Sequence, residues 1–207
     1  MRGWQIAVLA RTPVPGQVKT RLISRLGAVR AAELQAHLTE RALQRAREAC
    51  AHVALWLDGP ADSGSEELAR RFGAELLYQP DGDLGQRMLA AVRYAHALDM
   101  DSILIGTDCP AQAPDDLRQA RTRLARSDVV LQPAHDGGYV LIGIREPHPE
   151  LFTDIEWGSD KVLDATRRRC VGHGLRLAEL HALPDLDRPD DLEAAFAAGA
   201  LDRARWS

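Results

Sequence analysis

Several features are scarce or missing in this 207-residue sequence, and each absence excludes a class of protein. There are only three cysteines, Cys50, Cys109 and Cys170, and their wide spacing forms neither a disulfide framework nor a metal-ligand pattern. No apolar run is long enough to cross a membrane, and the N-terminal segment is too short and wrongly flanked for a signal peptide. We therefore expect a protein of the reducing cytoplasm.

An excess of positive charge is also missing. The chain has 26 Lys and Arg residues against 30 Asp and Glu residues, a net charge of -4, and its arginines are scattered along the sequence. Neither a nucleic-acid partner nor an anionic membrane surface is expected from this balance. Oligomeric state stays open, with a homo-oligomer as one outcome.

The chain has no internal repeat, linker or low-complexity tract, and its length suits one domain spanning 1–207. Strands and helices alternate along it. Strands are expected at 5–10, 52–57, 75–78, 102–105, 128–131, 139–144 and 175–180, and helices at 30–49, 65–72, 84–98, from 114, at 160–170 and at 189–198. This alternation predicts an α/β fold with a mostly parallel, doubly wound sheet.

Asp108 is the most informative residue. It follows the apolar run 102–105 within Gly106-Thr107-Asp108-Cys109-Pro110, at what should be the carboxyl end of a buried parallel strand. Open α/β sheets bind their ligands at that edge, and a carboxylate there can hold a divalent cation against phosphate oxygens. A capping or turn role for Asp108 is the alternative. We interpret Cys109 as a small packing residue.

The loop after the first strand, from Arg11 to Leu22, contains two prolines, a glycine and then Lys19 and Arg21. Lysine and arginine at the start of a helical segment favour a phosphate group, unless they are simply solvated. The loop contains neither the Gly-x-x-x-x-Gly-Lys-Ser/Thr nor the Gly-x-Gly-x-x-Gly fingerprint.

Two further segments allow a turn or a site. In 81–88, Asp83 could begin the next helix, while Gly85 and Arg87 could border a nucleotide. In 135–139, the Asp136-Gly137-Gly138-Tyr139 sequence is typical of a hairpin turn. It equally offers Asp136 as a base or substrate contact, with open backbone beside it.

The last two segments also have two interpretations. Trp157, in 152–159, could form a platform under an acceptor, although packing over the edge of the core is slightly favoured. Asp187, in 183–192, could be the N-cap of the last helix or could complete an oxygen-ligand metal site with Asp108.

Taken in order, these segments resemble a bacterial family of glycosyltransferase-A-like proteins, commonly labelled nucleotide-diphospho-sugar transferases, some linked to arsenosugar biosynthesis. The motifs that match are Pro-x-Pro-Gly-x-x-Lys-Thr-Arg-Leu, Leu-Gly-x-Arg-Met, Gly-Thr-Asp-Cys-Pro, Asp-Gly-Gly-Tyr, Trp-Gly-Ser-Asp and Asp-x-Asp-x-Pro-Asp-Asp-Leu. The resemblance extends from about residue 6 to about residue 192.

The resemblance implies a three-layer sandwich with a nucleotide-binding half at about 1–110 and an acceptor half at about 111–207. It implies Mg²⁺ or Mn²⁺ on Asp108 and Asp187, with a nucleotide-sugar or a nucleoside triphosphate and a small acceptor as the ligands. Catalytic roles are expected for Asp108, Lys19 and Asp136. Nucleotide or phosphate contacts are expected from Arg11, Lys19, Arg21, Gly85, Arg87 and Thr107, and acceptor contacts from Gly137, Gly138, Tyr139 and Trp157.

The reaction type stays open between two transferases. Many glycosyltransferases carry Asp-x-Asp after this strand, whereas here Cys109-Pro110 follows Asp108. The sequence around Asp108 is closer to the Gly-Asp-x-Pro of nucleotidyltransferases, and the first loop is similar to that of phospholactate guanylyltransferases. Glycosyl transfer is the first hypothesis, nucleotidyl transfer with pyrophosphate release the second, and a non-catalytic nucleotide- or sugar-binding domain the third.

Overall fold

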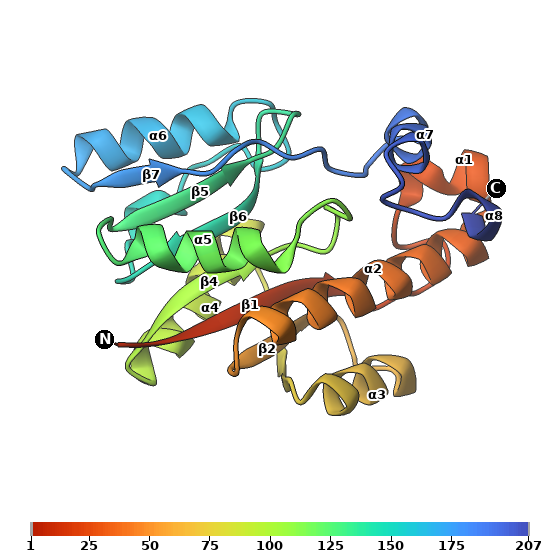
Figure 1. Ribbon diagram of the computed structural model, residues 1–207, viewed down its shortest axis with the longest axis horizontal. Coiled ribbons are helices and arrows are strands. Elements are labelled where there is room, and N and C mark those ends of the chain that lie inside the picture. Colours follow the sequence, from red (N-terminus) through yellow and green to blue (C-terminus); the bar gives the residue numbers. More distant parts are fainter. Residues whose placement is uncertain (1, 207) are drawn as a thin grey trace.

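A computed structural model describes residues 2–206. Its centre is a seven-stranded sheet in the order β3-β2-β1-β4-β6-β5-β7 (Figure 1). The strands are β1 (Gly3–Arg11), β2 (Val53–Asp58), β3 (Glu75–Tyr78), β4 (Met100–Ile105), β5 (Val129–Pro133), β6 (Tyr139–Ile144) and β7 (Leu177–Glu179). Only β6 runs antiparallel to its neighbours, so the expected mostly parallel mixed sheet is confirmed.

Helices cover both faces of the sheet, as the strand–helix alternation predicts. Helices α2 (Ala28–Ala49), α3 (Ser63–Phe72) and α5 (Pro114–Leu124) pack on one face, where Leu43, Ala69 and Leu117 share a core with Leu55 of β2. Helices α4 (Leu84–Ala97) and α6 (Val162–Gly172) cover the other face. Burying the sheet on both faces explains why its strands read as apolar runs.

A third, smaller core lies beyond the sheet, in a lobe on the right of Figure 1. It is formed by the short helices α1 (Ile23–Leu26) and α8 (Arg203–Trp206), by α7 (Pro189–Ala197) and by the start of α2. Leu22, Leu38, Phe196 and Trp206 are buried in it. The lobe therefore joins the loop after β1 to the C-terminal segment.

The element ends differ modestly from the sequence expectations. Helix α3 begins at Ser63 because Asp62 accepts a hydrogen bond from the Ser65 amide at 2.8 Å. Asp83 caps α4 as expected, in a reciprocal capping box with Gln86. The sequence analysis did not predict α8 or two single-turn 3₁₀ helices, Thr20–Leu22 and Pro149–Leu151. No helix within residues 2–206 is both long and apolar enough to span a bilayer.

Candidate functional site

Lys19 and Asp108 meet at the carboxyl edge of the sheet. The Lys19 ammonium lies 2.9 Å from the Asp108 carboxylate and donates a hydrogen bond to the Leu186 carbonyl at 2.6 Å. The Leu186 amide in turn donates to the Asp108 carbonyl at 2.7 Å. Three segments distant in sequence, the loop after β1, the end of β4 and the chain entering α7, are thus tied together at one point.

The backbone of Lys19 adopts an unusual conformation. Its φ of 47° and ψ of 39° place it in the left-handed region, which disfavours side chains other than glycine. Strain of this kind costs roughly 1–3 kcal/mol and persists where the surroundings hold it in place. Here the buried ammonium, only 4% exposed, is held by Asp108 and Leu186. This strained residue supports a functional role for the loop.

Two neighbours of Asp108 shape its surroundings. The Thr107 hydroxyl donates to Asp108 at 2.9 Å and accepts from the Gln35 amide at 3.1 Å. Thr107 is buried and its hydroxyl orients Asp108, while its expected phosphate contact stays a prediction. A Cβ built on Gly106 would meet no atom within 4 Å, so open space lies beside the strand end. The Asp108 side chain, 52% exposed, can reach a ligand there.

Arg21 and Asp187 form a second acid–base pair next to the first. The Arg21 guanidinium is ion-paired with the Asp187 carboxylate, and both side chains are partly exposed. Asp187 is not the N-cap of α7, because that position belongs to Arg188, whose amide donates to Asp191 at 2.7 Å. The Asp187 carboxylate does not cap the helix. It can therefore take part in the site, as the metal-ligand interpretation of the sequence requires.

Arg11 and Arg87 converge on a residue that the sequence analysis missed. Asp58, at the end of β2, accepts from Arg87 at 2.5 Å and lies 3.4 Å from Arg11. Arg11 pairs with Asp58 in the β1–β2 register, so strand pairing sets this contact. The acid ends an expected strand just as Asp108 does, and that signal could have identified it.

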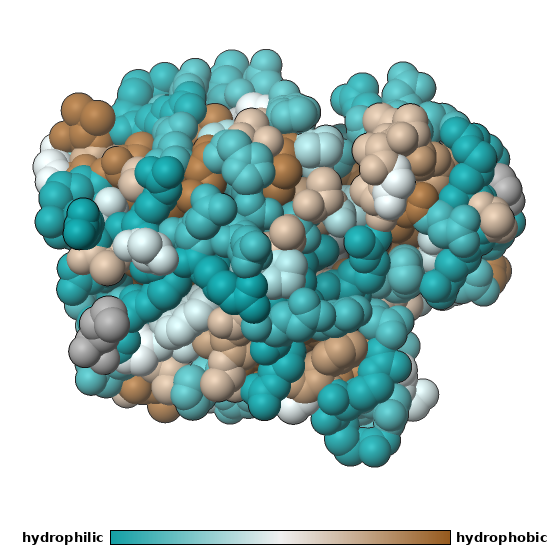
Figure 2. Space-filling model, viewed as in Figure 1, coloured by the Kyte–Doolittle hydropathy of each residue, from teal (hydrophilic) through white to brown (hydrophobic). Residues whose placement is uncertain are grey.

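A cavity of about 340 Å³ lies between the lobe and the β5–β6 hairpin. Figure 2 shows the surface hollowed between α7 and the region that carries α6. Five aspartates line the cavity, together with two arginines, His135, Gly158 and Ser159; the charged residues are Asp136, Asp160, Asp185, Asp187, Asp191, Arg21 and Arg188. The lining of this cavity is therefore strongly acidic.

Asp185 is the second residue that the sequence analysis did not select. Burial raises the pKa of its carboxyl above the usual value, and the negative charges of Asp136, Asp191 and Asp187 raise it further. A carboxylate with a raised pKa in a cleft is a candidate proton acceptor. Asp185 is the first residue of the Asp-x-Asp-x-Pro-Asp-Asp-Leu motif, but three other aspartates stand within six residues of it, so the sequence does not single it out.

The residues of the β5–β6 hairpin contribute more to the turn and to packing than the sequence analysis expected. The Ala134 amide donates to the Gly138 carbonyl at 3.0 Å, which closes the turn, and Asp136 accepts from the Gly138 amide at 2.9 Å. Gly137 has a φ of 91°, and a Cβ there would lie 2.2 Å from the Asp160 carbonyl oxygen. Tyr139 is partly buried and its hydroxyl is shielded from solvent, so its expected acceptor contact stays a prediction.

Gly85 and Trp157 pack against each other rather than facing a ligand. A Cβ on Gly85 would lie 2.1 Å from the Phe152 carbonyl oxygen and 2.8 Å from the Trp157 indole nitrogen. Gly85 is buried and allows this close approach of α4 and the 152–157 loop, while its expected nucleotide contact stays a prediction. Trp157 packs at the margin of the α4–α6 core, which agrees with the favoured interpretation.

Cys109 is buried, and burial raises the pKa of its thiol to about 11. The thiolate form is therefore suppressed at neutral pH, and the residue packs as expected.

The carboxylates at this edge can hold Mg²⁺ or Mn²⁺ only if a bound substrate and water supply the remaining oxygen ligands. Among residues 2–206, no group of three or more His, Cys, Asp or Glu side chains is arranged to hold a metal ion. Asp108 and Asp187 supply two exposed carboxylates from adjoining segments. Mg²⁺ commonly takes one or two protein carboxylates and completes its shell with substrate phosphates and water. Two acids are therefore enough for that mode of binding.

Comparison with known proteins identifies the family of this chain. Residues 39–159 match a family model described as an uncharacterized protein conserved in bacteria, DUF2064. The chain belongs to this family. No curated protein matches it.

Solved structures extend the comparison over the whole chain. A protein from Desulfovibrio desulfuricans G20, described as a "putative nucleotide-diphospho-sugar transferase", is 28% identical with a TM-score of 0.88, and the match covers 100% of this chain and 92% of that one. The inositol-1-phosphate CTP transferase of T. maritima matches with a TM-score of 0.62 at 13% identity, covering 96% and 95%.

Rv0371c of Mycobacterium tuberculosis, solved as a complex with manganese, matches with a TM-score of 0.53 at 18% identity, covering 94% of this chain and 99% of that one. At these lower identities the likeness concerns the fold. The comparisons confirm the expected fold. The description of the Desulfovibrio protein as a transferase agrees with the expected enzyme class.

Proposed function

We propose that this protein transfers a sugar from a nucleotide-diphospho-sugar to an uncharged small acceptor, with a divalent cation as cofactor. The proposal rests on two ion pairs at the carboxyl edge of the sheet, each between an aspartate and a cationic side chain. Asp108 pairs with Lys19, and Asp187 pairs with Arg21. A diphosphate and a cation together offer each of these four side chains a new partner of opposite charge.

Lys19 and Arg21 would hold the diphosphate. Arginine can grip phosphate oxygens through two parallel hydrogen bonds, whereas lysine acts as a compact point charge. Their positions are preorganised by Leu186, by Asp108 and by Asp187, so little reorganisation is needed when negative charge develops on the leaving nucleotide. Arg11 and Arg87 extend the positive surface toward the ends of β1 and β2.

Asp108 and Asp187 would hold the cation. When bound, Mg²⁺ or Mn²⁺ neutralises charge on the diphosphate as a Lewis acid. Thr107 keeps the Asp108 carboxylate turned toward the site, through a hydrogen bond relayed from Gln35. The half-buried position of Asp187 beside Arg21 lets it exchange one positive partner for another.

The acidic cavity would receive the acceptor. Asp136, anchored by the Gly138 amide, is one candidate to take the proton from an attacking hydroxyl, and Asp185 with its raised pKa is the other. The division of the chain near residue 110 into a donor half and an acceptor half is part of this proposal.

Nucleotidyl transfer is the alternative, because the T. maritima CTP transferase shares the fold. That reaction would require a phosphorylated acceptor to enter the same cavity. Its lining carries five aspartates against two arginines, and Arg21 is already paired with Asp187. Repulsion of like charge in a partly enclosed site disfavours an anionic acceptor, which supports glycosyl transfer.

One experiment separates the proposals. Purified protein is incubated with Mg²⁺ or Mn²⁺ and with panels of nucleotide-sugars and nucleoside triphosphates, each with neutral and phosphorylated acceptors. Release of nucleoside diphosphate with a neutral acceptor supports glycosyl transfer, and release of pyrophosphate contradicts it in favour of nucleotidyl transfer. Thermal stabilisation by nucleotide without turnover of any pair would indicate a binding domain.

A further inference from the structure

A second cavity, of about 940 Å³, lies at the opposite, amino edge of the sheet. It is bounded by the start of β1, the C-terminal end of α5 and β7. Four arginines, Trp4 and small residues line it; the arginines are Arg2, Arg121, Arg123 and Arg126. No Asp or Glu is among the residues that line it. The side chains that line it are basic, whereas those that line the cavity at the carboxyl edge are mostly acidic.

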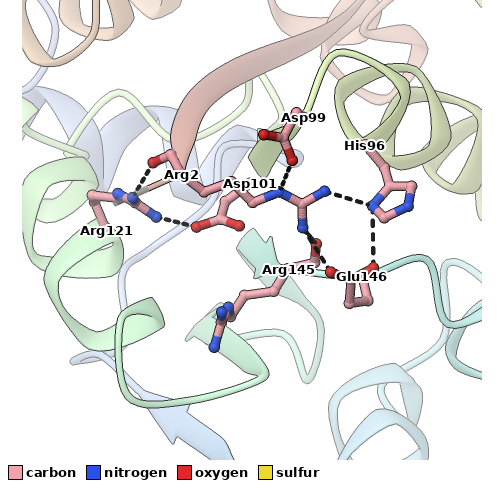
Figure 3. A network of polar contacts seen from close by, with 7 residues as sticks. All are labelled: Arg2, His96, Asp99, Asp101, Arg121, Arg145 and Glu146. Atoms are coloured by element: carbon pink, nitrogen blue, oxygen red, sulfur yellow. Dashed lines mark hydrogen bonds and ion pairs between the residues drawn. The ribbon is translucent and has the colours of Figure 1, made fainter.

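Two of these arginines are fixed by a polar network (Figure 3). The Arg2 guanidinium donates to Asp99 at 2.7 Å and to Glu146 at 2.6 Å, and it lies 3.1 Å from His96. Arg121 is ion-paired with buried Asp101 and donates to the Arg2 carbonyl at 2.7 Å. These contacts hold the base of the cavity in place.

The other two arginines of the cavity, Arg123 and Arg126, differ from these in their contacts. Arg123 and Arg126 are exposed, and within residues 2–206 neither side chain has a hydrogen-bond or ion-pair partner. Arginines near a helix C-terminus complement the helix dipole, which accounts for part of their placement. The dipole does not explain why no acid lines the cavity, nor why the half-buried Trp4 lines it together with these arginines.

We propose that this basic cavity binds a small organic phosphate, with the phosphate on Arg123 and Arg126 and a planar ring against Trp4. Guanidinium groups recognise phosphate through paired, charge-assisted hydrogen bonds. Indole supplies a large flat apolar surface for a ring. Neither arginine has a carboxylate partner that the phosphate would have to displace. No metal ion is therefore needed to neutralise a displaced carboxylate. The basic cavity is separate from the candidate active site and does not depend on the proposed function.

Calorimetric titration in EDTA tests the proposal, with UMP and inorganic phosphate as the probes. The wild-type protein should bind UMP saturably and several-fold more tightly than inorganic phosphate. The Arg123→Ala/Arg126→Ala variant should lose at least tenfold in UMP affinity. Arg93→Ala/Arg168→Ala is the matched control, because both of its arginines are exposed, lie outside the cavity and remove the same charge.

Three outcomes would overturn the proposal. One is absence of saturable UMP binding by the wild-type protein at concentrations up to roughly 10 mM, the scale of a very weak site. A second is equal loss of affinity in the control variant, which would reduce the effect to net charge. The third is loss of the EDTA-resistant binding in Lys19→Met but not in Arg123→Ala/Arg126→Ala, which would place the ligand at the carboxyl edge.

Discussion

The two cavities at the two edges of the sheet differ in the state of their cations. At the carboxyl edge Lys19 and Arg21 are each paired with an aspartate, whereas at the amino edge Arg123 and Arg126 have no such partner within residues 2–206. An anion at the first edge must displace a carboxylate, and that carboxylate is then free for a cation. An anion at the second edge displaces nothing. Metal dependence should therefore separate the two sites.

The largest effect is expected from Asp108→Ala. Loss of this carboxylate removes the partner of Lys19 and one proposed cation ligand, so transferase activity should fall by roughly 10²–10³-fold, the scale of a lost electrostatic stabiliser. Metal-dependent nucleotide binding, measured by calorimetry, should disappear, while UMP binding in EDTA should stay unchanged. Asp115→Ala removes an exposed aspartate on α5 and serves as the control. Retained metal-dependent affinity in Asp108→Ala would exclude Asp108 from the site.

Gly137→Ala should damage the carboxyl edge through the fold. The substitution forces a Cβ into a position with φ of 91° and against the Asp160 carbonyl at 2.2 Å. Left-handed strain and overpacking together should lower the free energy of unfolding by about 2–4 kcal/mol. Urea denaturation measures the loss, and Gly172→Ala, with no atom within 4 Å of the added Cβ, provides the control. Equal stabilities for these two variants would contradict the close contact.

The third prediction, with a smaller expected effect, concerns how the charge of the acidic cavity selects the acceptor. Asp185→Asn removes one of five aspartates from its lining, so the preference for a neutral over a phosphorylated acceptor should narrow by roughly 3–10-fold, equivalent to about 1 kcal/mol. The ratio of kcat/KM values for the two acceptors measures it. Asp164→Asn, an exposed residue of α6 outside the cavity, is the control. An unchanged ratio would mean that the cavity charge does not select the acceptor.

Periodicity and strand-end position predicted the fold and the centre of the site. Apolar runs separated by amphipathic helices identified the parallel sheet, and the carboxyl end of a parallel strand is where Asp108 had to lie. Lys19 could be selected because it is a charged residue that follows a stiff loop. Asp187 could be selected because it is a charged residue that precedes a helix. Their pairing with Asp108 and Arg21 depends on the lobe that joins the two ends of the chain, which local patterns do not encode.

The structural roles of small and aromatic residues were the hardest to predict from the sequence. Gly85 and Tyr139 stand next to loops typical of binding sites, at the starts of α4 and β6, yet Gly85 allows close packing and the Tyr139 hydroxyl is buried. A sequence shows that a glycine or an aromatic residue is needed but does not show which neighbour requires it. Asp58 and Asp185 were missed for a related reason, because their importance depends on charges brought near them by the fold.

The smallest effect concerns an acid beside the basic cavity. Asp128 follows Ser127 of the cavity lining, but its carboxylate is committed to Arg176, with contacts of 2.8 Å to the guanidinium and 2.9 Å to the amide. These hydrogen bonds lower the pKa of Asp128 from 3.8 to about 2. A lowered pKa in the folded state means that the carboxylate stabilises the protein above pH 3.8, and that this stabilisation is lost as the pH falls toward 2.

Asp128→Asn should therefore lower the free energy of unfolding by about 1 kcal/mol at pH 7, the scale of a partly exposed ion pair. The difference from wild type should shrink between pH 4 and pH 2, as followed by urea denaturation across that range. UMP binding in EDTA should change by less than about twofold, because the pair lies beside the cavity and contributes no ligand contact. A stability difference that persists unchanged at pH 2 would show that the side chain acts by packing rather than by charge.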